Sequence, residues 1–371
     1  ASGSYPVQQS ITLVYTNLSG SNTFALYRFL PEELRKEYDI TLLKFAPSRG
    51  EYFERLANSD AVVITEGNYL LDKTAFNPRQ LVVDLWHGLP LKTMGYADPN
   101  ERFKDRIPRR WASVDYVVSY SNLFTELMEQ CIRIGKAKYR VAGAPRNDFL
   151  FHSHGLDMLK RITGKDLGTG RRLFYLPTYR QVQYASGQRR YDSDNAWQYL
   201  FGIPGFDIER FASFLDREDL HLVLKLHPAE EHLFQNRFHD RSRIHILTNS
   251  LLERMRCDLY EVLNAADLLI TDYSSVYFDY LLLDRPIVFV PADIQSYRDR
   301  RGFLLNPYED WTPGPKAYSQ AELEREVLQA LSDPSYYSTE RRRIRELCHA
   351  YPDGKSSQRV WSLIHESLRV Q

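Results

Sequence analysis

Short apolar runs that alternate with helical patterns are the feature that most limits what this 371-residue chain can fold into. The apolar residues of these runs are continuous rather than alternating, as in parallel strands that are buried on both faces. In the first part of the chain the runs lie in residues 10–17, 38–45, 60–67, 80–88, 115–121 and 139–148, with helical patterns at 24–37 and 122–134. This alternation predicts a series of βαβ units in a doubly wound parallel sheet.

The same pattern starts again in the second part of the chain. We expect strands within 171–180, 220–228, 243–247, 267–275 and 285–291, and helices at 207–216, 259–266, 276–283 and 321–331. The sequence therefore predicts an α/β fold of two Rossmann-like domains, residues 1–150 and 171–350. We interpret the polar, glycine-containing stretch 151–170 as a linker. We expect the last segment, 351–371, to form a helix that packs back on the first domain.

The composition excludes several classes of protein. Lys and Arg together number 48, as do Asp and Glu, so the chain has no overall charge that would attract nucleic acid or a membrane. Cys131, Cys257 and Cys348 are widely spaced and form no Cys-x-x-Cys pair, which is typical of reduced thiols in a cytosolic protein. No signal peptide is visible, and no apolar run reaches the ~18 residues of a membrane-spanning helix. Any site for an anion must therefore be local.

Polar residues at the ends of the predicted strands mark the candidate site, because ligands of doubly wound sheets bind at the carboxyl ends of the strands. The apolar residues 268–270 run into Thr271, Asp272, Tyr273, Ser274 and Ser275 before a helix begins. Backbone N–H groups at a helix start, the helix dipole and serine hydroxyls suit a pyrophosphate. A plain helix cap explains the same residues equally well.

Asp279 lies one turn into that helix. It reaches a ribose diol, as acidic residues do in dinucleotide sites, or it belongs to a solvated helix face.

Two histidines also follow predicted strands. Lys225 and His227 are two residues apart and so share one side of a strand, where together they suit an anionic ligand. An edge lysine and a capping histidine are the alternative. His87 ends an apolar strand before Gly88, and a histidine there is either a general base or a structural residue.

Two further strand ends carry polar residues. Thr178 and Arg180 are placed to meet a phosphate or the edge of a nucleobase. Arg146, Asn147 and Asp148 lie where the first domain ends, and a hinge packed by polar bonds is their favoured interpretation.

Several other motifs are interpreted as non-functional. Asp192 and Asp194 have the spacing of a metal-binding Asp-x-Asp motif but lie in a polar loop, and His152 and His154 lack a further ligand nearby. The chain has no Gly-x-x-x-x-Gly-Lys-Ser/Thr loop, no Gly-x-Gly-x-x-Gly and no Gly-x-Ser-x-Gly elbow. Basic clusters at 102–111 and 341–346 are candidates for contact with anionic lipid, although a solvated face is the better interpretation of the second.

The motifs in their order identify a family. WHGLPLKTMG (86–95), GAPRND (143–148), YLPTYR (175–180), KLHP (225–228), the segment 270–290, RRGF (300–303) and DGKSSQRV (353–360) follow one another along the chain. Together they closely resemble the CDP-glycerol glycerophosphotransferase family of wall teichoic acid synthesis, of the TagB/TarB and TagF type. The resemblance covers residues 81–370 and implies a GT-B fold, with the active site in the cleft between two Rossmann-like domains.

The resemblance also implies roles for single residues. His87 matches the general base and His227 the second essential histidine, at the donor phosphates. On the donor side we expect Thr178, Arg180, Lys225, Thr271, Asp272, Ser274, Ser275 and Asp279. On the acceptor side of the cleft we expect Trp86, Gly88, Lys92, Arg146, Asn147 and Asp148. The resemblance implies no metal and no cofactor.

The implied reaction moves glycerol phosphate from CDP-glycerol to the ManNAc hydroxyl of undecaprenyl-pyrophosphate-linked GlcNAc-ManNAc and releases CMP. The chain begins almost at its first predicted strand, and its length is typical of the primase that adds the first glycerol phosphate. The partners are then CDP-glycerol, the lipid-linked acceptor and the membrane surface at its cytoplasmic face, and not nucleic acid. The alternatives are a polymerase that uses CDP-glycerol or CDP-ribitol, a sugar-nucleotide glycosyltransferase of GT-B fold, and a non-catalytic nucleotide-binding scaffold.

Overall fold

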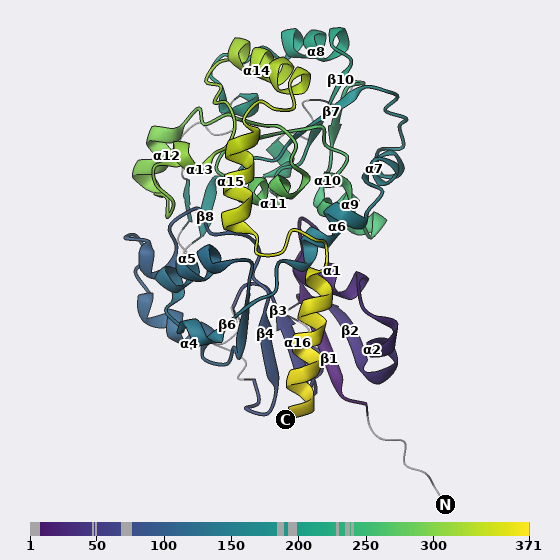
Figure 1. The fold of residues 1–371 in the computed structure, drawn as a ribbon, viewed down its shortest axis with the longest axis vertical. Helices are drawn as coiled ribbons and strands as arrows, with labels where there is room; N and C mark the ends of the chain where they lie inside the picture. The colour runs from purple at the N-terminus through teal and green to yellow at the C-terminus, as the bar shows by residue number, and fades with distance from the viewer. Residues whose placement is uncertain are drawn as a thin grey trace, which may run out of the picture. The chain divides into compact units, whose positions relative to one another are not determined.

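The computed structural model describes residues 8–46, 48, 50–67, 76–183, 189–191, 199–227, 230–233, 238 and 241–370. The chain divides into two compact units, each with its own parallel sheet (Figure 1). The first unit comprises Ala1–His87, Asp105–His152 and His349–Gln371, and the second comprises Gly88–Lys104 and Ser153–Cys348. Asp192 and Asp194 lie outside the described residues.

The first unit is built on a six-stranded parallel sheet of order β2-β1-β3-β4-β5-β6. Every strand predicted for this part of the chain is confirmed. The strands are β1 Ser10–Tyr15, β2 Asp39–Lys44, β3 Ala61–Ile64, β4 Leu81–Asp84, β5 Tyr116–Ser119 and β6 Tyr139–Val141. Because β3 lies on the opposite side of β1 from β2, the strand order reverses at β1, and sheets of this kind bind ligands at such a reversal.

Helices of the first unit cover this sheet. They are α1 Asn22–Arg28, α2 Glu32–Glu37, α3 Gly50–Ala57, α4 Ile107–Trp111, α5 Asn122–Ile132, α6 Asp148–His152 and α16 Ser356–Val370. The prediction of one helix over 24–37 is wrong, because a second helix, α2, begins after Pro31. A proline disfavours the helical conformation in the residue that precedes it.

The last helix belongs to the core of the first unit. In α16, which Figure 1 draws in yellow, the side chains of Val360, Trp361 and Ile364 are buried with those of the sheet. The indole N–H of Trp361 donates to the carbonyl of Leu26 in α1 at 2.9 Å. The segment that ends the chain is therefore a structural part of the unit that begins it.

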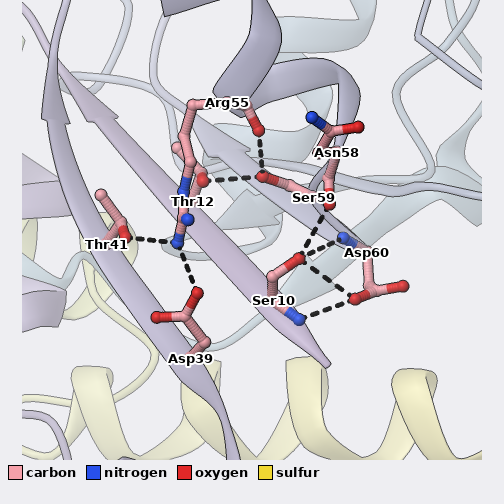
Figure 2. Close-up of polar contacts among 8 residues, drawn as sticks. All are labelled: Ser10, Thr12, Asp39, Thr41, Arg55, Asn58, Ser59 and Asp60. Atoms are coloured by element: carbon pink, nitrogen blue, oxygen red, sulfur yellow. Dashed lines mark hydrogen bonds and ion pairs between the residues drawn. The ribbon is translucent and has the colours of Figure 1, made fainter. Parts of the chain in front are cut away.

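A polar cluster fastens β1, β2 and the end of α3 to one another (Figure 2). The guanidinium of Arg55 in α3 donates to Asp39 at 2.8 Å and to Thr41 at 2.5 Å, both on β2. The hydroxyl of Thr12 on β1 lies 2.7 Å from that of Ser59, just after α3. These contacts secure the edge of the sheet with hydrogen bonds between side chains.

The second unit has a five-stranded parallel sheet of order β11-β10-β7-β12-β13. Its strands, β7 Arg171–Tyr175, β10 Leu220–Leu224, β11 Ile244–Ile246, β12 Leu268–Thr271 and β13 Ile287–Phe289, all lie within the predicted segments. A separate antiparallel pair, β8 Gln181–Gln183 and β9 Arg189–Tyr191, was not predicted. The strand order reverses at β7, so the loops after β7 and β12 meet at the reversal.

The helices of the second unit are α7 Gly155–Thr163, α8 Ile208–Arg217, α9 Asn249–Met255, α10 Leu259–Leu263, α11 Val276–Tyr280, α12 Ile294–Arg300, α13 Tyr308–Trp311, α14 Gln320–Ser332 and α15 Ser338–Cys348. The interpretation of 151–170 as a linker is wrong for α7, which buries Leu159 and Ile162. Gly164 ends this helix with a φ of +66°, so a glycine that suggested a linker is a helix cap.

Two further properties concern the helices and the cysteines of the described residues. No helix among them is both long enough and apolar enough to cross a bilayer. The three cysteines, all described, are buried and form no disulfide, which confirms the prediction of reduced thiols.

Candidate functional site

His87 follows β4 at the carboxyl edge of the first sheet, and its imidazole is exposed. The ring stacks on that of Trp86, with centroids 4.1 Å apart. The Nδ1 atom lies 2.8 Å from the carbonyl oxygen of Thr65, in the loop after β3. Because a carbonyl only accepts, Nδ1 carries the hydrogen, and in the neutral ring Nε2 is the nitrogen that accepts a proton. The geometry thus suits a general base.

Two residues distant in sequence hold the backbone beside His87. The side-chain amide of Asn22 in α1 donates to the carbonyl of Trp86 at 2.7 Å. The guanidinium of Arg146 donates to the carbonyl of His87 at 2.8 Å and to that of Gly20 at 3.0 Å. Arg146, which is 4% exposed, therefore holds the histidine loop in place, and its assignment to the acceptor side stays a prediction.

Asn147 and Asp148 are also buried, at 3% and 2% exposure. The carboxylate of Asp148 accepts from the backbone N–H groups of Ser356 and Ser357 at 2.9 and 2.7 Å. Burial raises the pKa of Asp148, and these hydrogen bonds oppose that shift. Asp148 therefore anchors the start of α16, which agrees with the interpretation of these residues as polar packing, and its assignment to the acceptor side stays a prediction.

Lys225 and His227 follow β10 but have different surroundings. Lys225 is 4% exposed, and its ammonium donates to the carboxylate of Glu231 at 2.7 Å. Burial lowers the pKa of Lys225, whereas Glu231 opposes that shift. The charge of Lys225 is thus largely neutralised inside the second unit.

His227 is the residue of this pair that reaches the surface. Its ring stacks on that of Tyr179, with centroids 4.0 Å apart. Although the side chain is exposed, the protein packed around the ring lowers the pKa of His227 to about 4, and the charges of Lys225 and Lys92 add to this shift. His227 is consequently neutral near pH 7 and stands beside cations, a setting that suits contact with phosphate oxygens.

Lys92 belongs to the second unit, although it lies in the motif that contains His87. It forms an antiparallel bridge with Phe303, and the neighbouring Thr93 N–H donates to the carbonyl of Gly302 at 3.3 Å. The WHGLPLK motif therefore contributes His87 to the first unit, and Gly88 and Lys92 to the second. The assignment of Lys92 to the acceptor side stays a prediction.

The loops after β7 and β12 are joined by buried polar contacts. Asp272, which is 1% exposed, accepts from the Thr178 N–H at 2.8 Å and pairs with the guanidinium of Arg180 at 2.8 Å. Arg180 is 5% exposed and also pairs with Asp293 at 3.2 Å. A buried arginine requires such counter-ions. Arg180 therefore braces these loops, and its contact with the donor stays a prediction.

Thr271 is fully buried, and its hydroxyl donates to the carbonyl of Leu176 at 2.7 Å. Thr178 is 2% exposed. Like Asp272, these two residues shape the ends of their strands from inside the unit rather than presenting side chains at its surface.

Ser274 and Ser275 are partly exposed at the start of α11. Ser275 is the cap residue of this helix, yet its side chain makes no capping hydrogen bond within the described chain. The plain-cap interpretation is therefore wrong for Ser275, and the pyrophosphate interpretation stays a prediction.

Asp279 is not on a solvated helix face. It is 1% exposed, and its carboxylate accepts from the hydroxyl of Tyr260 at 2.7 Å. Its contact with a ribose stays a prediction.

His152 and parts of the two basic clusters make contacts within the protein. The Nε2 atom of His152 lies 2.8 Å from the carbonyl of Gly354, which is a structural contact. Arg341 in the second basic cluster is 2% exposed and donates to backbone carbonyls, so that cluster is not wholly a solvated face. In the first cluster Trp111 is 4% exposed, and the centroid of its ring lies 5.8 Å from that of Trp86. Arg109 of the same cluster is exposed.

Comparisons with known proteins agree with the motifs. The model of the family CDP-Glycerol:Poly(glycerophosphate) glycerophosphotransferase matches residues 35–366. A teichoic acid poly(glycerol phosphate) polymerase of Bacillus subtilis (strain 168) is 28% identical over 68% of this chain, and the match spans about a third (32%) of that relative. A teichoic acid glycerol-phosphate primase of the same organism is 27% identical over 83% of this chain and 74% of its own length.

The solved structures show the same fold. A structure of the wall teichoic acid polymerase TagF superposes with a TM-score of 0.78 at 21% identity, and covers 98% of this chain and 90% of that one. The α/β architecture with parallel sheets is thus shared with TagF.

Proposed function

The chain belongs to the CDP-glycerol:poly(glycerophosphate) glycerophosphotransferase family, and from this premise we propose that it transfers glycerol phosphate from CDP-glycerol to a lipid-linked saccharide. The acceptor we propose is the ManNAc hydroxyl of undecaprenyl-pyrophosphate-linked GlcNAc-ManNAc, which makes the enzyme a teichoic acid primase. The observation that carries the proposal is the contact of His87 Nδ1 with the carbonyl of Thr65, because it leaves Nε2 as the basic nitrogen at a surface-exposed position.

The reaction follows from a proton transfer and one displacement. Nε2 of His87 takes the proton of the acceptor hydroxyl, whose oxygen forms a bond to the phosphorus that carries glycerol. The bond from that phosphorus to the bridging oxygen breaks, and CMP leaves with the electron pair. A positioned base contributes about 10²–10⁴-fold to such a step.

Charge on the oxygens of the transferred phosphoryl group requires hydrogen-bond donors or cations. We propose that His227, Ser274, Ser275 and Lys92 supply them in the second unit. The neutral ring of His227 and the side chain of Lys92 influence one another electrostatically. Lys225 does not take part directly, because Glu231 already pairs with its ammonium. Positioning and electrostatics carry most of a phosphoryl transfer, and these groups make no demand for a metal.

The proposed acceptor is anchored in the membrane by its lipid, so we propose that the enzyme works as a peripheral protein at the cytoplasmic face. Arg109, which is exposed on α4, is the candidate for contact with anionic lipid.

A polymerase is the second candidate, because the relative named as a polymerase is 28% identical to this chain and the relative named as a primase is 27% identical. The number of glycerol phosphate groups added to one acceptor distinguishes a primase from a polymerase. The test uses the purified protein, CDP-glycerol and a short-chain analogue of the lipid-linked disaccharide, with product masses read by mass spectrometry. We expect one added glycerol phosphate and one CMP released. A ladder of additions would establish a polymerase, and release of a nucleoside diphosphate instead of CMP would refute the proposed chemistry.

A further inference from the structure

We propose that Asp84 is a positioning residue for His87, because its carboxylate joins the two loops that fix the imidazole with Nε2 as the proton-accepting nitrogen. This inference rests on the proposed function of His87 as a base. Asp84 ends β4 and is fully buried, three positions before His87.

The carboxylate of Asp84 bridges two loops of the first unit. One oxygen accepts from the backbone N–H of Trp86 at 2.6 Å, in the loop after β4. The other accepts from the backbone N–H of Gly67 at 2.5 Å, in the loop after the neighbouring strand β3. One side chain therefore ties together the loop that bears His87 and the loop that contains Thr65.

Each of these loops provides one contact that orients the imidazole of His87. The β3 loop supplies the Thr65 carbonyl that accepts from Nδ1. The β4 loop supplies the ring of Trp86, on which the imidazole stacks. If the loops shift relative to one another, the ring loses either its hydrogen bond or its stacking partner.

The β4 loop needs this support because its backbone is unusual. Trp86 has a φ of +52°, in the left-handed region that residues other than glycine rarely adopt. Such a conformation persists only where surrounding contacts impose it. Asp84 holds the N–H of Trp86, and Asn22 holds its carbonyl. The strained residue directly precedes the proposed base.

A carboxyl group, with one oxygen for each of the two N–H groups, is what this arrangement requires. It offers an acceptor to both N–H groups, whereas an amide of the same shape has one oxygen and turns its NH₂ toward one of them. Burial raises the pKa of Asp84 to about 7, the two backbone hydrogen bonds oppose that shift, and the charge of Glu66 adds to it. Asp84→Asn therefore keeps the volume of the side chain and removes one of the two loop contacts.

The test reads the tautomer of His87 directly and compares it with turnover. In protein labelled with ¹⁵N-histidine, the His87 resonances are identified by their loss in His87→Gln. We expect Nδ1 to be protonated in the wild type. In Asp84→Asn we expect a mixture of tautomers and a fall in kcat of about tenfold to hundredfold, with the KM for CDP-glycerol within about twofold.

Asp115→Asn is the matched control, because Asp115 accepts from the N–H of Val82 near the other end of β4, at 2.8 Å. It should change neither readout. If Asp84→Asn does not fold, Asp84→Ser, which keeps one acceptor, is measured in its place.

The outcomes separate the inference from the proposed function. A changed tautomer with unchanged turnover would support the positioning role of Asp84 and refute His87 as the base. An unchanged tautomer in a folded Asp84 variant would overturn the inference whatever the activity. A wild-type ring protonated at Nε2 would overturn it without any variant.

Discussion

His87 and His227 occupy equivalent places in two different sheets. Each follows a parallel strand, each is exposed, and each stacks on an aromatic ring about 4 Å away, Trp86 for His87 and Tyr179 for His227. Their neighbours differ. His87 donates to a carbonyl and lies near the buried carboxylate of Asp84, whereas the surroundings of His227, with Lys225 and Lys92, lower its pKa to about 4.

We propose that this difference prepares one residue type for two tasks. A ring with one nitrogen fixed on a carbonyl presents the other to a proton, as a base must. A ring beside cations is kept neutral, and a bound phosphate would favour its protonation. We therefore expect His87 to govern turnover and His227 to govern donor binding.

The largest effect is expected for His87→Ala. Without the base, kcat should fall by about 10²–10⁴-fold, while the affinity for CDP-glycerol stays within about twofold. Steady-state CMP release and calorimetry measure the two quantities. His154→Ala, which removes an exposed histidine at the start of α7, is the control and should leave both unchanged. A large loss of donor affinity in His87→Ala would contradict its role as a base.

His227→Ala should lower the affinity for CDP-glycerol. Hydrogen bonds to charged groups contribute about 1.5–3 kcal/mol, so the dissociation constant for CDP-glycerol should rise by about ten- to hundredfold. Calorimetric titration measures this change. His232→Ala, a histidine in the 3₁₀ turn Glu231–Leu233 of the same unit, is the control. Unchanged donor affinity in His227→Ala would remove the distinction between the two histidines.

The double variant Ser274→Ala and Ser275→Ala tests whether the donor phosphates lie at the start of α11. Each lost hydroxyl contact should cost about 0.5–1.5 kcal/mol, so the loss of both should lower donor affinity by about fivefold to 150-fold. Stability should change little, because the Ser275 side chain does not cap the helix. Equal affinity for variant and wild type in calorimetry would place the phosphate site elsewhere.

The pH dependence of donor binding sharpens the account of His227. The free ring has a pKa of about 4, below its ordinary value of 6.5, and a bound pyrophosphate should raise it. Binding then takes up a proton, so affinity should increase as pH falls, by about tenfold between pH 7.5 and 5.5. Titrations in buffers of different ionisation enthalpy measure the uptake. The same slope in His227→Gln would assign the proton to another group.

The smallest effect concerns the membrane. An exposed arginine near an anionic surface contributes about 1 kcal/mol, so Arg109→Gln should weaken sedimentation with anionic liposomes by about fivefold. Arg342→Gln, an exposed arginine of the second basic cluster, is the control. Equal loss in both variants would mean that α4 has no special role in docking.

The sequence predicted most of the fold, because continuous apolar runs are a direct consequence of burial on both faces of a parallel sheet. All eleven strands of the two parallel sheets lie in predicted segments. Helices such as α9 and α15 were missed. In α15 few residues are buried, and Arg341 takes one of the inner positions, so its pattern is weakly apolar.

The candidate site was predicted less completely, because its contacts join residues far apart in the chain. Asn22 and Arg146 hold the His87 loop across 64 and 59 positions, and a single sequence gives no signal of such pairs. The spacing of Lys225 and His227 correctly indicated a strand end, but not that Glu231 would neutralise the lysine. The polar residues that proved buried, Arg180 and Asp148 among them, look the same in a sequence as ligand-binding residues.

The separate roles of the two histidines are tested most directly by single-turnover release of CMP, followed as a function of CDP-glycerol concentration with acceptor in excess. We predict that His87→Ala lowers the plateau rate and leaves the half-saturating donor concentration unchanged. We predict that His227→Ala raises that concentration at least tenfold. If both variants change the same parameter by the same factor, the two histidines act as one unit, and the comparison on which this account depends is wrong.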